Sequence, residues 1–366
     1  MEILDEDGNL LGVVNIVDAF VIIFILAVII GGVTLVFGED NADEEPTLGT
    51  THVTLDFGTQ PAFIASEINT GDTYSAGGNS QLTLTDVYFA SQGNGTRIIA
   101  RAALQAPVSG DSISYSDAPP RLGRTLEVTT DRYQVSGQIQ SVGQNESLVR
   151  EDSAVVLESV MGTAEAREVT AGDQVRLGGR TVATIENVNK FATQDPDQTR
   201  LVVGVSLQTL ALNGQQQFGT TPIQQGTAIM LDTGEYTFSG PIQRVGTSQP
   251  LESVTTRTVK VQMSDIREER ASAIQPGMTE QNGDLTTARV TDVEIRPSPM
   301  ILTADNGSVN VAEHPVNRDV VITMELRMQE TRNGVRFKGQ SLRQGSTVVF
   351  DLGTISIEAS VVNVSA

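Results

Sequence analysis

The chain has few residues that could carry out catalysis, and they lie far apart in the sequence. Its two histidines are His52 and His314, and it has no cysteine. Neither histidine has a second one at the spacing of zinc-binding motifs, and no phosphate-binding glycine loop or Gly-x-Ser-x-Gly nucleophile motif occurs. The lack of cysteine excludes disulfides and thiol nucleophiles. We therefore expect neither an enzyme nor a bound cofactor.

Carboxylate side chains offer one candidate cation site. Asp195 and Asp197 stand two residues apart in a polar stretch and could give oxygen ligands to Ca²⁺ or Mg²⁺. The acidic clusters at 5–7 and 39–45 lack the spacing of a calcium loop and are typical of solvated surface. We expect no metal centre, and Asp195 and Asp197 are the positions to check.

Four asparagines begin the Asn-x-Ser/Thr triplet that N-linked glycosylation requires, so they are candidate modification sites. They are Asn94, Asn145, Asn306 and Asn363. The triplets favour a position outside the cell for the residues after 50, although such triplets also arise by chance in chains rich in serine and threonine.

The chain is strongly acidic, and its basic residues are nearly all arginine. The formal net charge is −21, and only Lys190, Lys260 and Lys338 among the 24 basic residues are lysines. Acidic, lysine-poor surfaces suit proteins in concentrated salt, where repulsion between carboxylates is screened over short distances. The composition favours a halophilic source, with an ordinary acidic surface as the alternative. It argues against nucleic acid as a partner, because phosphate binding needs clustered Lys and Arg.

An uncharged, apolar run over residues 19–38 has about the length of a helix that crosses a bilayer. Because apolar residues also precede it, we predict a transmembrane helix over 13–38, between a short acidic cytoplasmic tail (1–12) and an acidic linker (39–50). A cleaved signal peptide would need a basic start and a shorter apolar run, and a buried core helix is the other alternative. We expect a single-pass protein of the cell membrane, with the N-terminus inside and the C-terminal domains outside.

Two sequence markers occur three times in the same order, at intervals of about 100 residues. One has the pattern apolar-x-x-Gly-Asp, and the other has the pattern Tyr-x-apolar-x-Gly, each weaker in its third copy. Their first residues are Ile68, Val169 and Ile274 for one marker and Tyr133, Tyr236 and Ile355 for the other. This interval is the size of a small domain rather than of a solenoid turn, so the sequence predicts three tandem copies of one module.

Apolar and polar residues alternate within each copy, as in a half-buried β-strand. The alternation is clearest over 96–104, 200–207 and 320–328, and Gly137 and Gly240 fall on the inward face, where glycine marks a bulge or tight barrel corner. Five or six short strands per copy favour a closed barrel, which has no exposed edges. We predict a mainly β fold with three small β-barrel-like domains, at 51–143, 155–246 and 258–366, the third with an insertion near 298–315.

Several stretches resemble a family of single-span, membrane-anchored prokaryotic proteins of unknown function, of the haloarchaeal DUF4330 type. They are Asp7–Asp18 before the apolar run and 288–293, 319–326 and 342–348 in the third copy. This resemblance implies membrane attachment and a β-rich outer part, and it implies no activity. Gly172–Ile185 is similar, more faintly, to an early segment of tandem MCE lipid-transport domains, which implies an oligomeric carrier.

These observations leave two functions open. The first is an extracytoplasmic structural or interaction protein of the cell envelope, a string of β modules that self-associates or binds envelope partners. Repeated domains supply reach and multivalency without new chemistry. The alternative is an MCE-like oligomeric carrier of lipid or another apolar ligand. A stable oligomer that co-purifies with lipid would favour the carrier.

Overall fold

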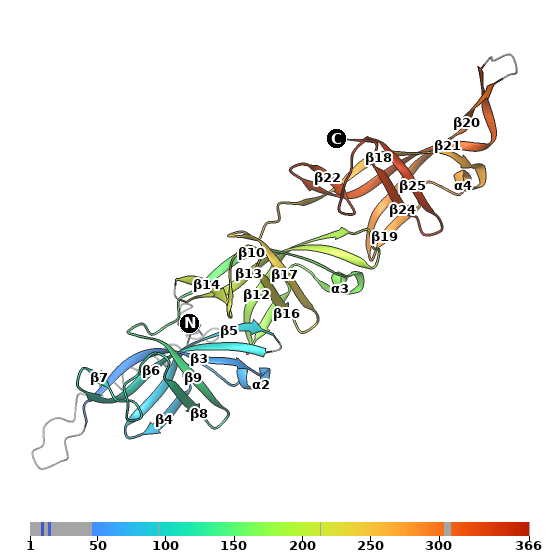
Figure 1. Ribbon diagram of the computed structural model, residues 1–366. Helices are drawn as coiled ribbons and strands as arrows, with labels where there is room; N and C mark the ends of the chain where they lie inside the picture. The colour runs from blue at the N-terminus through green and yellow to red at the C-terminus, as the bar shows by residue number, and fades with distance from the viewer. Residues whose placement is uncertain are drawn as a thin grey trace, which may run out of the picture. The chain divides into compact units, whose positions relative to one another are not determined.

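The computed structural model describes residues 9–10, 14–15, 46–93, 95–212, 214–303 and 309–365. The chain divides into two compact units, Met1–Thr47 and Leu48–Ala366. The described part of the first unit contains two short antiparallel strands, β1 (Asn9–Leu10) and β2 (Val14–Asn15). The second unit is mainly β and contains three antiparallel, barrel-like sheets (Figure 1).

The prediction of a transmembrane helix over 13–38 is wrong. Among the described residues, the longest helix has six residues, and none is long and apolar enough to cross a membrane. Strand β2 lies within the range assigned to the helix and pairs with β1. The other residues of that range lie outside the described residues. Hydropathy reports how apolar a stretch is, and it does not by itself decide which backbone conformation the stretch adopts.

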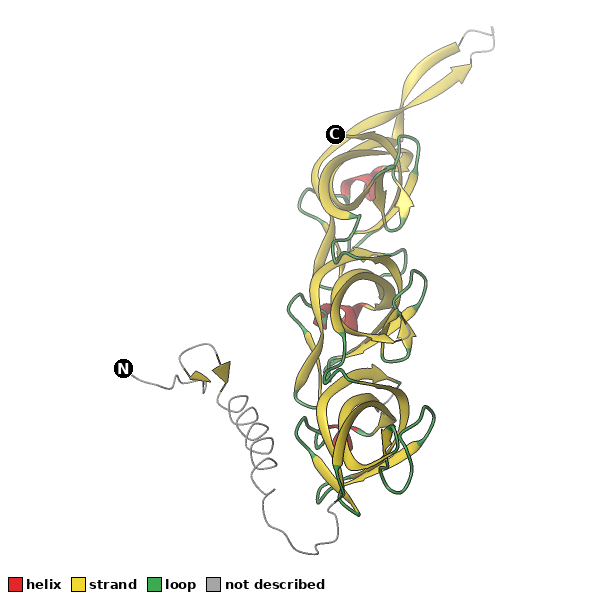
Figure 2. Cartoon of the chain, turned by 90° about the vertical axis from the view of Figure 1, so that its left-hand side faces the viewer, coloured by secondary structure: helices red, strands yellow, loops and turns green. Residues whose placement is uncertain are grey.

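The three sheets repeat one topology, which confirms the prediction of a mainly β fold with three tandem barrel-like units. Their strand orders are β4-β5-β6-β3-β9-β8, β11-β12-β13-β10-β17-β16 and β19-β20-β21-β18-β25-β24. In Figure 2 each sheet curls into a ring of strands around its own interior.

The main strands have similar lengths in the first two copies, whereas β20 and β21 of the third copy are longer. The first sheet contains β3 (Leu48–Gln60), β4 (Thr73–Gly77), β5 (Ser80–Gln92), β6 (Gly95–Ser109), β7 (Ser112–Ile113), β8 (Thr125–Thr129) and β9 (Gln134–Gly143). The second contains β10 (Arg150–Gly162), β11 (Gln174–Leu177), β12 (Arg180–Ala192), β13 (Gln198–Leu212), β14 (Gln215–Phe218), β15 (Thr221–Pro222), β16 (Ala228–Asp232) and β17 (Thr237–Val245). The third contains β18 (Ser253–Arg267), β19 (Thr279–Asn282), β20 (Leu285–Thr303), β21 (Val309–Thr331), β22 (Gly334–Phe337), β23 (Gln340–Ser341), β24 (Thr347–Asp351) and β25 (Ser356–Val364).

The alternating residues fill the barrel interiors. In β6, the side chains of Ile98, Ala100, Ala102 and Leu104 are fully buried, and β13 and β21 bury the corresponding residues. The first two sheets share one continuous hydrophobic cluster, whereas the third has a cluster of its own. Since small barrels leave room only for side chains, these interiors are packed cores.

A short helix follows the first strand of each sheet, and each of these helices buries one alanine against its barrel. The helices are α2 (Ala62–Ala65), α3 (Thr163–Glu168) and α4 (Glu268–Ser272), and the buried alanines are Ala65, Ala166 and Ala271. The small side chain lets the helix lie close to the strands.

The third sheet differs by a long two-stranded arm. Strands β20 and β21 continue to pair beyond the barrel, from Pro299 opposite Glu313 to Thr303 opposite Val309. This arm lies within the range 298–315, where the sequence predicts an insertion.

The two repeat markers meet in space. The Tyr133 hydroxyl donates a hydrogen bond of 2.6 Å to the Asp72 carboxylate, and Tyr236 donates to Asp173 in the second copy. Each bond ties the turn after the short helix to the last hairpin of the sheet. In the third copy, Met278 and Ile355 occupy these positions and pack against the core instead.

The marker glycines have a backbone role. Gly71, Gly172 and Gly277 have φ values of 91°, 102° and 94°, and their N–H groups donate to Leu84, Ile185 and Val290. Glycine adopts this left-handed conformation without steric cost, which accounts for its presence in every copy. Gly240 lies where strands approach closely, since a Cβ there would stand 2.2 Å from the Glu158 carbonyl oxygen, and a Cβ on Gly137 would stand 2.7 Å from the Phe57 ring.

The role of the Tyr–Asp hydrogen bond in closing the first two barrels can be tested by removing the tyrosine hydroxyl of the second copy. Burial raises the pKa of Tyr236, and its hydrogen bond to Asp173 raises it further. Burial alone would raise the pKa of Asp173, but hydrogen bonds from Tyr236 and Thr170 lower it below the usual 3.8. Tyr236→Phe should therefore destabilise the protein by about 1.5–3 kcal/mol at neutral pH. Urea unfolding followed by circular dichroism measures this change.

The pH dependence of that difference has a defined sign. Because the folded-state pKa of Asp173 is depressed, its contribution is complete above the unfolded value and is lost as the pH falls through the folded value. The gap between wild type and Tyr236→Phe should shrink below about pH 4. Tyr115→Phe is the control, because the buried Tyr115 hydroxyl has no hydrogen-bond partner among the described residues. Equal losses in the two variants would contradict the role of the bond.

Candidate functional site

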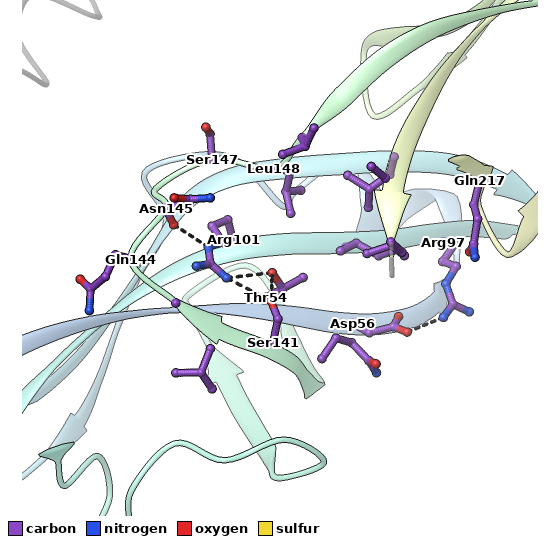
Figure 3. Close-up of a pocket in the computed structure, with 18 residues that line it drawn as sticks. Thr54, Asp56, Arg97, Arg101, Ser141, Gln144, Asn145, Ser147, Leu148 and Gln217 are labelled. Atoms are coloured by element: carbon purple, nitrogen blue, oxygen red, sulfur yellow. Dashed lines mark hydrogen bonds and ion pairs between the residues drawn. The ribbon is translucent and has the colours of Figure 1, made fainter. Parts of the chain in front are cut away.

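A cleft of about 480 Å³ lies where the first sheet meets the second (Figure 3). Residues of β3, β6 and β9 form one wall, the connecting segment 144–149 forms the rim, and the ends of β13 and β14 form the far side. Each wall therefore comes from a different part of the chain.

The Arg101 guanidinium occupies the centre of the cleft wall. The residue is only 4 % exposed. Its Nε donates to the Asn145 carbonyl at 2.7 Å, and its Nη1 donates to the hydroxyls of Thr54 at 2.9 Å and Ser141 at 3.3 Å (Figure 3). Burial lowers the pKa of Arg101. Every partner in this set is electrically neutral.

A second arginine in the cleft is paired. Arg97 forms an ion pair with Asp56, whose carboxylate also accepts the Gly58 N–H at 2.9 Å. The second sheet has the equivalent pair between Arg200 and Glu158, at 2.6 Å. Because the pair recurs at the same register position, it is a structural feature of the module.

His52 lies on β3, two residues before Thr54. Its Nδ1 is buried and has no hydrogen-bond partner among the described residues. Burial lowers its pKa below 6.5, while Glu146 raises it and Arg101 lowers it. His314 lies on β21 of the third sheet, where its Nδ1 accepts the N–H groups of Val316 and Asn317. The two histidines therefore belong to different sheets and form no catalytic pair.

The candidate cation ligands form a local turn. The Asp195 carboxylate accepts the Asp197 N–H at 3.0 Å, and the Asp197 carbonyl accepts the N–H of Thr163 at 2.8 Å. Within the described parts of the chain, no group of three or more His, Asp or Glu side chains could hold a metal ion. The hydrogen bonds of Asp195 and Asp197 therefore stabilise this turn.

The candidate glycosylation sites are scattered. Asn145 lies at the rim of the cleft, where its carbonyl binds Arg101. Asn363 is an exposed residue of β25, opposite Lys260. Asn94 and Asn306 lie outside the described residues. Whether any of the four carries a glycan stays a prediction.

Specific contacts join the first sheet to the second. The Tyr88 hydroxyl donates to the Gln208 carbonyl at 3.0 Å and accepts the Gly219 N–H at 3.3 Å. The Arg180 guanidinium lies 4.9 Å from the centre of the Phe89 ring. Asp86 binds Arg150 and the Leu148 N–H. Sequence reasoning missed this junction, although a buried tyrosine hydroxyl and an arginine beside a strand end are the residues that such contacts use.

A different set of contacts joins the second sheet to the third. The Asn282 amide accepts from the Thr199 hydroxyl at 2.7 Å and donates to the Pro196 carbonyl at 3.0 Å. Arg167 and Asp284 form an exposed ion pair at 3.5 Å. A second cleft, of about 610 Å³, lies beside this junction and includes Glu280 and Lys338, which form an ion pair.

A family model described as a domain of unknown function, DUF4330, matches residues 1–89 and 246–365, which together are more than half of the chain. The chain belongs to the DUF4330 family. The DUF4330 match takes in the start of the first sheet and nearly all of the third, and it leaves out the second. It confirms the predicted family, whereas the fainter likeness to MCE domains gains no support. No curated protein and no solved structure matched the chain.

His52 gives the cleft region a testable pH dependence. Because the folded-state pKa of His52 lies below the unfolded value of 6.5, the unfolded chain binds the proton more tightly. Stability is therefore complete above about pH 6.5 and falls as the pH drops toward the folded value. His52→Gln should flatten this fall, as measured by thermal unfolding at intervals between about pH 5 and pH 8. An unchanged profile in the variant would assign the fall to another group.

Proposed function

We propose that this DUF4330 protein is an interaction scaffold that associates end to end with copies of itself. Three linked β-barrels supply repeated surfaces, and within the described residues no three His, Asp or Glu side chains gather as metal ligands. The observation that carries the proposal is that both junctions inside the chain use the same parts of the module. At the two ends of the described series, those parts have no neighbour among the described residues.

The shared part is a hairpin tip that lies against the short helix of the preceding module. In the second module the tip is Gly178, where a Cβ would stand 3.0 Å from the Ala65 carbonyl of the first module. In the third module it is Gly283, where a Cβ would stand 2.8 Å from Thr163 of the second. Both glycines have positive φ, so the tip is tight and approaches its neighbour closely.

The first module has the same tip, and no described residue lies against it. Gly78 has φ 56°, and a Cβ added there would meet no atom within 4 Å. At the other end, α4 of the third module is exposed except for Ala271. Among the described residues, one tip and one helix therefore have no neighbour, and they are the two halves of the junction that the chain makes twice internally.

The arm of the third module adds an apolar surface beside the free helix. Ile301 and Val311 face each other across the arm and are 71 % and 72 % exposed, and Val309 on the same face is 62 % exposed. Contiguous exposed apolar side chains mark interaction sites. A two-stranded ribbon also needs a further packing surface for stability in water.

A second copy is the partner that the repeat favours. A head-to-tail contact between different surfaces of identical chains extends into an open filament when it does not close into a ring. The net charge of −21 opposes such assembly in dilute salt, and concentrated salt screens this repulsion. We therefore propose a salt-rich setting, which agrees with the arginine-dominated, acidic composition.

The alternative of a lipid carrier has less support. The barrel interiors are filled by side chains such as Leu55 and Ile98, and the two clefts contain charged residues. A position in the cell envelope stays a prediction.

Analytical ultracentrifugation of the full chain tests the assembly. The wild type should form larger species as protein concentration rises, and more so at about 2 M than at about 0.1 M NaCl. Val311→Asp should weaken association at least about tenfold, because a charge would be buried in an apolar contact.

Asn310→Asp is the matched control. It adds the same charge one residue away, on the opposite face of the arm, and should leave association unchanged. A wild-type chain that stays monomeric at about 100 µM in both salts would contradict the proposal, as would equal effects of the two substitutions.

A further inference from the structure

We propose that the cleft between the first and second modules binds an oxyanion group, a carboxylate or a phosphate, through Arg101. The proposal rests on the surroundings of this side chain and does not depend on self-association. Arg101 is the only arginine among the described residues that is fully buried. Its hydrogen-bond partners are a carbonyl and two hydroxyls, so among the described residues its charge has no counter-ion within hydrogen-bond distance, although Glu146 and Arg101 both act on the charge of His52.

Arg97, the other arginine that lines the cleft, has a carboxylate partner, and so does Arg150 at the junction, whereas Arg180 lies over the Phe89 ring. Arg97 pairs with Asp56, and Arg150 pairs with Asp86. The carboxylate of Asp56 also lines the cleft, but it is held by Arg97 and by the N–H of Gly58. A buried charge without a partner is costly in free energy. The chain has a net charge of −21, so the lack of a carboxylate partner for Arg101 does not come from a shortage of acidic residues. An anion from solution would supply the missing partner.

Comparison of the copies shows that the cleft is specific to the first junction. Arg101 lies opposite Thr54 in the sheet register, and the equivalent residue of the second sheet is Gly204, opposite Val156. A Cβ on Gly204 would stand 1.7 Å from the Ser248 carbonyl, so the following linker lies directly on the sheet there. In the first copy Arg101 holds the linker at Asn145 and leaves the space open.

One terminal nitrogen of Arg101 is available to a ligand. Nη2 makes no hydrogen bond to the described residues, and it lies 3.5 Å from the position that a Cβ on Gly143 would take. Gly143 lines the cleft, so the absence of a side chain there leaves the approach to Nη2 open. A guanidinium binds carboxylate and phosphate with short, charge-assisted hydrogen bonds, and the Ser141 and Thr54 hydroxyls flank the same place.

Isothermal titration calorimetry of the full chain with sodium phosphate and with sodium acetate, at constant ionic strength against chloride, tests the site. We expect one site per chain. Arg101→Gln should weaken binding at least about tenfold. Arg327→Gln is the matched control, because Arg327 is a half-buried arginine of the third module and lies outside this cleft. Binding of phosphate alone would assign the site to phosphate groups, and binding of both would support the general oxyanion site.

A second variant keeps the test decisive if Arg101→Gln fails to fold. Gly143→Val leaves the guanidinium in place and puts a side chain over Nη2, so it should weaken anion binding while the circular dichroism spectrum stays that of the wild type. Gly143 ends strand β9, where a β-branched residue is well tolerated. Wild-type affinity in folded Gly143→Val or Arg101→Gln, or no binding of either anion at about 10 mM, would overturn the proposal.

Discussion

The hydrogen bond between the two repeat markers is the constraint on which each of the first two barrels depends. Asp72 and Asp173 lie just after the short helix, and their tyrosine partners lie in the turn that joins the last two strands of the same sheet. The bond therefore holds the last hairpin of the sheet against the turn that follows the short helix. Because each aspartate also accepts an N–H from its own turn, one carboxylate both shapes the turn and closes the barrel. The third module replaces this polar pair by Met278 and Ile355, which shows that the closure can be made by packing instead.

Much of the fold follows from local patterns. The period of two in the strands, the recurring Gly-Asp turn and the spacing of the markers are sufficient to predict three tandem β modules. They are sufficient because a strand's burial pattern and a glycine's backbone conformation are decided within a few residues. The weaker third marker also has a local cause, since Met278 and Ile355 keep the position but change the chemistry.

The features that sequence reasoning missed are those decided over long distances. Nothing near Arg101 in the sequence shows that its neighbours in space are neutral, because Thr54, Ser141 and Asn145 come from other strands and a linker. The spacing of Asp195 and Asp197 suggests cation ligands, but in the fold these residues serve a turn.

The module tolerates change at its junctions more readily than in its core. At one register position the copies have Arg101, Gly204 and Thr323, whereas the buried faces of the same strands stay apolar throughout. A glycine at this position lets the next linker pack flat on the sheet, and an arginine holds it away and leaves a charged cleft. A single outward residue thus decides whether a junction is closed or open to a ligand. Tandem copies of one barrel can in this way acquire distinct binding surfaces without any change in the barrel itself.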